Sequence, residues 1–389
     1  MPALILAFSR GMLIPILPIY AKEWDVSYGL VGLVLAGEGL GMLLGDIPAG
    51  MLLPRLGQKG TMLLGVGCTL LSTVALFWAG TVPQAVIYRL LAGLGRAMYG
   101  VSRHAYVADA SAVTSRGRAI SLFGGLFRIG RFAGPMVGGI VAATYGLRET
   151  FLLFGGSSAA ALVVMAVFVR VVETSRDRDS HGSRAAGFAL LSALKGQYRV
   201  LAAAGAGQLF AQMIRAGRGI ILPLYAADVV GLDVEAIGLI LSLSSAIDMS
   251  LFYPAGLIMD RLGRKCAIVP SFLVQALGMF LVPFTGSFTG LLLASMVIGF
   301  GNGLGSGSMM TLGADLAPQH SRGEFFGLWR LIGDGGSTAG PLVVGEVADL
   351  VALPVAAWAM SGAGVIAAAI FVLLVPETLR KRRRGVGLS

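Results

Sequence analysis

The sequence predicts an all-α membrane protein with 12 transmembrane helices in two pseudo-symmetric six-helix bundles. Composition is the first reason: 56% of the 389 residues are hydrophobic and 13% are charged, whereas soluble domains are about 25% charged. The second reason is a series of apolar runs, each near the roughly 20 residues that a helix needs to cross a bilayer. The third reason is a repeat, because the second half of the chain echoes the first.

Each apolar run predicts one spanning helix. In order, the runs lie near residues 2–21, 28–51, 60–79, 83–108, 118–143, 150–171, 200–227, 235–258, 266–284, 288–313, 324–350 and 354–375. A polar stretch interrupts the series and is typical of a linker, with a short amphipathic helix expected near 188–199. We therefore expect an N-terminal bundle, a cytoplasmic linker, a C-terminal bundle and a basic cytoplasmic tail, at residues 1–171, 172–199, 200–378 and 379–389.

Basic residues fall on one side of the predicted membrane. They follow every second span or lie in the tail, whereas the opposite side holds only Lys22 and Arg148. This asymmetry predicts that both termini are cytoplasmic, in a multi-pass protein of the bacterial inner membrane. The net charge of +10 follows this topology, so we expect a lipid bilayer as partner and no nucleic acid. No basic stretch precedes the first run, so we also expect no cleaved signal peptide.

A ten-residue motif, Gly256 to Lys265, shows how the chain repeats. Its echo begins at Gly50, 206 residues earlier, and the same offset relates Asp109 to Asp315. Six spans return the chain to the side on which it began. The halves should therefore share one orientation, as a parallel repeat about an axis along the membrane normal.

Two six-helix halves with this motif between the second and third spans resemble the major facilitator superfamily. The second copy is complete at Gly256, Asp260, Arg261, Gly263, Arg264 and Lys265. The first copy keeps Gly50, Arg55, Gly57 and Lys59 but has Pro54 in place of the acid and Gln58 in place of a base. The resemblance implies a gating role for these residues, which latch the outward-open state, with Asp109 and Arg116 as partners for Arg55.

Two further motifs carry the resemblance. Arg89, Gly93 and Gly95 resemble the family's motif for proton transfer. A glycine-rich stretch resembles the motif of the 12-helix drug:proton antiporters, at Gly130, Gly134, Pro135, Gly138 and Gly139. Glycines four residues apart also form a smooth stripe that another helix can approach closely, so the second motif is compatible with plain packing.

Charged residues inside the spans are the main candidates for function, because a charge at the bilayer centre costs about 2.5–3.5 kcal/mol on insertion scales. Nine are arginines: Arg10, Arg89, Arg96, Arg103, Arg128, Arg131, Arg215, Arg218 and Arg330. Five are acids: Glu38, Asp46, Asp248, Asp334 and Glu346. Some arginines must therefore face water, backbone carbonyls or an anion.

We expect six of these arginines to bind substrate: Arg10, Arg96, Arg128, Arg131, Arg215 and Arg218. Guanidinium groups suit phosphate and carboxylate, and the repeat-related Arg10 and Arg215 resemble the paired arginines of organic-phosphate transporters. The alternative is internal pairing, such as Arg10 with Glu38 or Arg128 with Asp334.

A proton-coupled carrier also needs a carboxylate that takes up and releases a proton, and a nearby arginine tunes its pKa. Glu38 is the first choice, followed by Asp334 and Asp248. Asp46 and the motif residue Arg89 complete the expected proton-coupling set.

These observations predict a secondary active transporter that works by alternating access. We favour proton-coupled efflux of a small organic, drug-like or amphipathic solute, for which an anion is one option. The alternatives are an organic-anion or organophosphate exchanger or uptake carrier, a lipid or glycolipid flippase, and a transport-dead receptor. No phosphate-cradling loop, metal-ligand cluster or nucleophilic triad is apparent, so we expect no enzyme, no cofactor and no metal. We expect a monomer.

Overall fold

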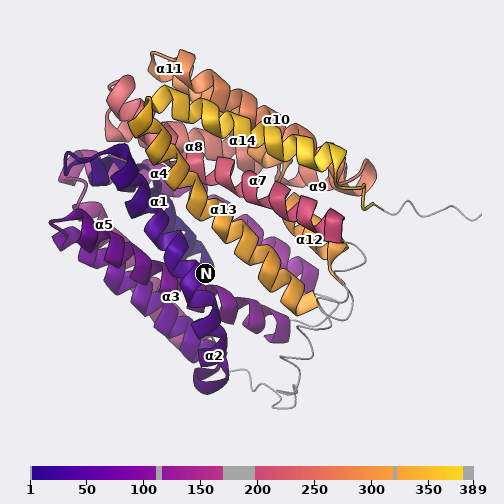
Figure 1. Ribbon diagram of the computed structural model, residues 1–389. Helices are drawn as coiled ribbons and strands as arrows, with labels where there is room; N and C mark the ends of the chain where they lie inside the picture. Colours follow the sequence, from indigo (N-terminus) through magenta and orange to yellow (C-terminus); the bar gives the residue numbers. More distant parts are fainter. Residues whose placement is uncertain (1, 111–115, 170–197, 319–321, 380–389) are drawn as a thin grey trace, which may run out of the picture.

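The computed structural model describes residues 2–110, 116–169, 198–318 and 322–379 (Figure 1). These residues are almost entirely helical. The first half contains α1 (Pro2–Lys22), α2 (Tyr28–Ala75), α3 (Val82–Ala110), α4 (Arg116–Tyr145) and α5 (Glu149–Phe168). The second contains α7 (Tyr198–Leu224), α8 (Val234–Ser250), α9 (Phe252–Arg261), α10 (Lys265–Leu281), α11 (Phe288–Leu304), α12 (Ser308–Leu316), α13 (Arg322–Leu350) and α14 (Leu353–Leu373).

The long element α2 contains two of the predicted spans, 28–51 and 60–79. Gly57 interrupts it with φ 69° and ψ 174°, a conformation that glycine adopts without steric cost. Gly41 and Gly45 pack against Leu90 and Leu94 of α3, whereas Gly65 and Thr69 pack against Tyr99 and Gly95 in the reverse order. The two arms of α2 therefore run antiparallel, and Gly57 marks the turn between them.

Two other predicted spans are each built from two helices. The span at 235–258 comprises α8 and α9, and the span at 288–313 comprises α11 and α12, which begins after Gly307 at φ 75°. With α2 counted as two passes, the described helices give the 12 passes of the predicted fold. The predicted linker at 172–199 lies outside the described residues except for 198–199, which begin α7, and the tail does so except for Leu379.

Seven helical stretches among the described residues are long and apolar enough to cross a membrane. The long helices α3, α4, α7 and α13 are not among them. These four carry eight of the nine arginines predicted to lie within the membrane. The low hydropathy of these four helices therefore comes from arginines, which are the candidates for a functional site inside the protein.

The helix pairs α4–α8 and α2–α13 make the most extensive contacts between the halves, which Figure 1 draws in indigo to magenta and in rose to yellow. In one pair, Gly139 of α4 lies against the backbone of Val234 and Gly238 on α8. In the other, Gly32 of α2 lies against the Pro341 carbonyl of α13. Small residues allow this backbone approach without side chains in between. Each contact brings charged residues of the two halves close together.

Candidate functional site

Glu38 lies between two arginines of α3. Its two carboxylate oxygens each accept a hydrogen bond from one guanidinium, Oε2 from Arg89 and Oε1 from Arg96. The arginines are seven residues apart and thus share one face of α3. Gly93 of α3 packs directly on the Glu38 backbone, which lets the two helices approach. We call these three residues the Glu38 cluster; Arg10 of α1 also interacts electrostatically with Glu38.

A second carboxylate, Asp248 of α8, binds an arginine from the other half. Arg128 of α4 donates to Asp248 Oδ1 at 2.8 Å, and Asn302 of α11 donates to Oδ2 at 2.7 Å. The second guanidinium nitrogen of Arg128 donates to Ser306 Oγ at 2.7 Å. The guanidinium also lies 4.7 Å from the ring centroid of Phe252. Arg128 therefore pairs with Asp248, and the alternative pairing with Asp334 is wrong.

Three further arginines surround this ion pair without a carboxylate of their own. Arg131 of α4 and Arg218 of α7 interact electrostatically with Asp248, and Arg215 interacts with Asp248 and Arg131. Within the described ranges, none of these three forms an ion pair. We call Arg128, Arg131, Arg215, Arg218 and Asp248 the junction cluster. It holds four guanidinium groups and one carboxylate, drawn from both halves.

Arg215 of the junction cluster has a buried donor atom without a hydrogen-bond partner among the described residues. One of its terminal nitrogens donates to the Gly305 carbonyl at a long 3.4 Å. Its guanidinium lies 5.1 Å from the Phe272 ring centroid, a favourable cation–π geometry. Its Nε atom is buried and has no hydrogen-bond partner in the described part of the chain. Such a donor is costly unless a ligand or water meets it.

A third cluster combines Asp46 of α2 with Arg330 and Asp334 of α13. Arg330 Nη2 lies 3.1 Å from Asp46 Oδ1, and Arg330 Nε lies 3.3 Å from Asp334 Oδ2. The guanidinium lies over Gly100 of α3, where a Cβ atom would be 3.1 Å from Nη2. This Asp46 cluster also crosses between the halves. Unlike the junction cluster, it holds two carboxylates and one arginine.

Polar contacts also join the two halves of the protein at the end where α1 leads into α2. Both oxygens of Asp349, at the end of α13, accept hydrogen bonds from backbone N–H groups of α2, from Tyr28 at 2.7 Å and from Gly29 at 2.8 Å. The Tyr28 hydroxyl donates to Asp228 at 2.9 Å. A carboxylate of one half thus caps a helix of the other and stabilises its N-terminus.

The predicted gating motif of the second half forms a network within that half. Arg264 binds Asp315 at 3.0 Å and Asp260 at 3.2 Å. Gly263 has φ 122°, a conformation that favours glycine. In the first half, Arg55 is exposed and Lys59 donates to the Ala166 carbonyl at 2.6 Å. The side chains of Asp109 and Arg116, its predicted partners, lie outside the described residues.

Sequence reasoning missed Glu377, which follows α14. Its oxygens accept the backbone N–H groups of Arg264 at 2.9 Å and Lys265 at 3.0 Å, where α10 begins. Burial opposes ionisation of Glu377, but the hydrogen bonds from Leu379, Lys265 and Arg264 outweigh it and lower the pKa of this carboxyl. A sequence signal exists, because Val375-Pro-Glu-Thr-Leu-Arg380 echoes Val171-Val-Glu-Thr-Ser-Arg176.

The glycines of the antiporter-type motif serve packing directly. Gly130, Gly134 and Gly138 lie against Ala7, Gly11 and Met12 of α1, and Gly139 faces α8. Because both neighbours contact the stripe by their backbones, any side chain there would push α4 away from α1 or from the other half. The motif therefore holds Arg128 and Arg131 at the junction.

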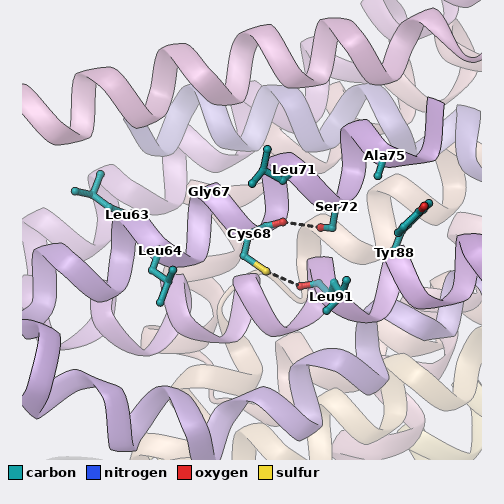
Figure 2. A pocket seen from close by; sticks show the side chains of 9 residues that line it. All are labelled: Leu63, Leu64, Gly67, Cys68, Leu71, Ser72, Ala75, Tyr88 and Leu91. Carbon is teal, nitrogen blue, oxygen red and sulfur yellow. Dashed lines mark hydrogen bonds between the residues drawn. The ribbon is translucent and has the colours of Figure 1, made fainter. Parts of the chain in front are cut away.

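A groove of about 610 Å³ between the second arm of α2 and α3 is a separate feature (Figure 2). Its lining is apolar and includes Leu63, Leu71 and Leu91. Two polar side chains of the lining donate to backbone: Cys68 Sγ donates to the Leu91 carbonyl at 3.3 Å, and Ser72 Oγ donates to the Cys68 carbonyl at 2.7 Å. None of the predicted site residues lines the groove.

Comparison with known proteins finds a family model that spans nearly the whole chain and relatives that match all or part of it. The family model described as Major Facilitator Superfamily matches residues 3–213 and 204–388. An uncharacterized MFS-type transporter of Methanocaldococcus jannaschii is 24% identical over 88% of each chain. Multidrug resistance protein 2 of Bacillus subtilis is 29% identical over 41% of this chain and 39% of that protein.

Solved structures share the fold. A bacterial homolog of the human lysosomal transporter Spinster, in an inward-facing and occupied conformation, superposes with a TM-score of 0.79 at 14% identity, covering 96% of this chain and 94% of that one. A D-xylose-proton symporter gives a TM-score of 0.76 at 18% identity, covering 97% of both chains. Both similarities concern the arrangement of helices.

Proposed function

Because the chain belongs to the Major Facilitator Superfamily and is therefore a membrane-spanning transporter rather than an enzyme, we propose that it exports a small organic anion in exchange for protons. The two halves move relative to each other around a site between them. Partial similarity to a multidrug resistance protein supports export of a drug-like solute. Both termini are cytoplasmic in this proposal.

The observation that carries the proposal is the surplus of positive charge in the junction cluster. Asp248 forms its ion pair with Arg128, so Arg131, Arg215 and Arg218 have no carboxylate of their own among the described residues and share the field of Asp248. Uncompensated charges at membrane depth are costly. A carboxylate, sulfonate or phosphate group on the cargo would supply the missing negative charge through bidentate hydrogen bonds.

The position of the junction cluster supports transport rather than storage of the anion. Arg131 lies on α4 of the first half, whereas Arg215 and Arg218 lie on α7 of the second. Without an anion these arginines repel one another across the junction, and a bound anion attracts both sides. Substrate binding therefore favours approach of the halves, which is the differential interaction that a conformational change requires.

Flux into proteoliposomes tests this function. The vesicles contain a pH-sensitive dye, and the probes are 2-naphthalenesulfonate and N-methylquinolinium, which have similar sizes and permanent opposite charges. We expect the sulfonate to enter vesicles with an acidic lumen and to make the lumen more alkaline. Entry of the cation alone would contradict an anionic cargo. Entry of the sulfonate with no pH change would favour the rival function, anion exchange.

A further inference from the structure

We infer that Asp46 binds the coupling proton and that its protonation releases the contact between α2 and α13; this rests on the proton coupling proposed above. The reaction is protonation of one carboxylate, in which Asp46 changes from –COO⁻ to –COOH and its ion pair with Arg330 breaks. The structure supports this choice over Glu38, the first choice from the sequence, by the balance of charges in each cluster.

Glu38 and Asp248 are poor proton acceptors because arginines outnumber them. Glu38 binds two guanidinium groups and has Arg10 nearby. Asp248 binds Arg128 and Asn302 and has Arg131 and Arg218 nearby. Nearby positive charge and donated hydrogen bonds both favour the ionised carboxylate. A proton must therefore compete with several groups at each of these positions.

The Asp46 cluster has the opposite balance. Asp46 and Asp334 share Arg330. Among the described residues, Arg330 and Asp334 are the charged groups that act electrostatically on Asp46. On the neighbouring helix α3, His104 interacts electrostatically with Arg330 and with Arg103. Two carboxylates on one guanidinium leave one negative charge uncompensated, and a single proton removes it.

Geometry distinguishes the two carboxylates. Arg330 and Asp334 are four residues apart on α13, where such pairs are mutually accessible, and Nε donates to Asp334. Asp46 Oδ1 lies 3.1 Å from Arg330 but has no aligned hydrogen bond in the described part of the protein. Protonation of Asp46 thus leaves the pair on α13 intact. Protonation of Asp334 would instead leave Arg330 with Asp46 as its only carboxylate.

The Asp46 cluster lies at the contact between α2 and α13, where the loss of one ion pair can alter how the two halves pack. The glycine contacts between α2 and α13 include Gly32 with Pro341 and Gly39 with Thr338. Asp46 follows Gly39 by seven residues, nearly two turns, and so continues the same face of α2. Its pairing with Arg330 therefore continues the line of contact between the halves, and a proton that breaks this pairing favours their separation.

Distance measurements between spin labels test the inference without a cargo. The labels are attached at Met51→Cys on α2 and Leu328→Cys on α13, both exposed positions, in full-length protein with Cys68→Ser and Cys266→Ser. We expect the wild-type distance distribution to shift to longer distances on acidification. Asp46→Asn should show the long distances at every pH, and Asp334→Asn should show the short distances at every pH. Glu346→Gln, also on α13, is the matched control and should respond like wild type.

Retention of the pH response in Asp46→Asn would overturn the inference, as would a wild-type distribution that does not change with pH. The flux assay separates this result from the proposed function. If wild-type vesicles move no protons with the sulfonate, proton coupling itself fails. If wild type moves protons and Asp46→Asn still does so, only the assignment of Asp46 fails.

Discussion

Arg128 of α4 and Asp248 of α8 form a 2.8 Å ion pair that joins the two halves of the fold. Asp248→Asn should destabilise the protein by about 3 kcal/mol, the lower end for a buried pair, because both side chains keep some exposure. The loss leaves four arginines with no carboxylate between them. The free energy of unfolding, measured in detergent with increasing denaturant, reports the effect.

The matched variants for this prediction are Arg128→Gln and the double variant. The double variant should be more stable than the sum of the single effects predicts, with a coupling of about 1–3 kcal/mol, because contacting charges are not additive. Additive effects would mean that the ion pair contributes nothing to the junction.

Arg131→Gln should raise the melting temperature while it weakens anion binding. The substitution removes one member of a like-charged group that has no carboxylate of its own, so the ligand-free protein gains stability. Melting curves with and without 2-naphthalenesulfonate test both effects. Arg261→Gln, at the exposed C-terminal end of α9, serves as control. A lower melting temperature with unchanged anion binding would show that Arg131 supports the structure instead.

Glu38→Gln should impair folding and all transport together. Glu38 binds both Arg89 and Arg96, so its neutralisation leaves one buried and one partly buried guanidinium group without their carboxylate. We expect low yield and loss of both pH-driven and gradient-driven sulfonate flux. A Glu38→Gln variant that retains gradient-driven flux and loses only the pH response would restore Glu38 as the proton carrier.

The hydrogen bonds that Glu377 accepts from the gating motif predict that the stability of the protein depends on pH. Its pKa is lower in the folded protein, so its contribution is present above the unfolded pKa of about 4.3 and is lost as the pH falls through the folded pKa. Wild type should therefore melt above Glu377→Gln at neutral pH, and the two curves should converge in acid. A constant difference at all pH values would contradict the capping role.

The fold was largely predictable from the sequence, because the lengths of the apolar runs, their hydropathy and the repeat all agree with 12 transmembrane helices in two halves. The sequence predicted a boundary between the spans at 28–51 and 60–79. In the structure Gly57 alone makes the turn between them, so α2 continues without a separate loop. The apolar runs at 83–108, 118–143, 200–227 and 324–350 predicted α3, α4, α7 and α13, although these four helices are not among the most apolar stretches because they carry arginines. The repeat, which depends on motif spacing rather than on apolar content, predicted that the two halves share one orientation.

Charge pairing was less predictable. The pair Arg330 with Asp334 follows from i,i+4 spacing, but its third member Asp46 is on a helix of the other half. The partner of Arg128 is Asp248 because α4 packs on α8, a contact that no local pattern encodes. Glu377 was missed because it caps a helix that begins 112 residues earlier in the chain. Such contacts depend on how the halves dock.

Calorimetric titration of the purified wild-type protein with permanently charged probes tests the arginine-rich junction most directly. We predict that 2-naphthalenesulfonate binds, that N-methylquinolinium does not, and that Arg131→Gln and Arg215→Gln each weaken sulfonate binding at least about tenfold, the effect of roughly 1.4 kcal/mol. Binding of the cation, or sulfonate binding unchanged in both variants, would contradict the account.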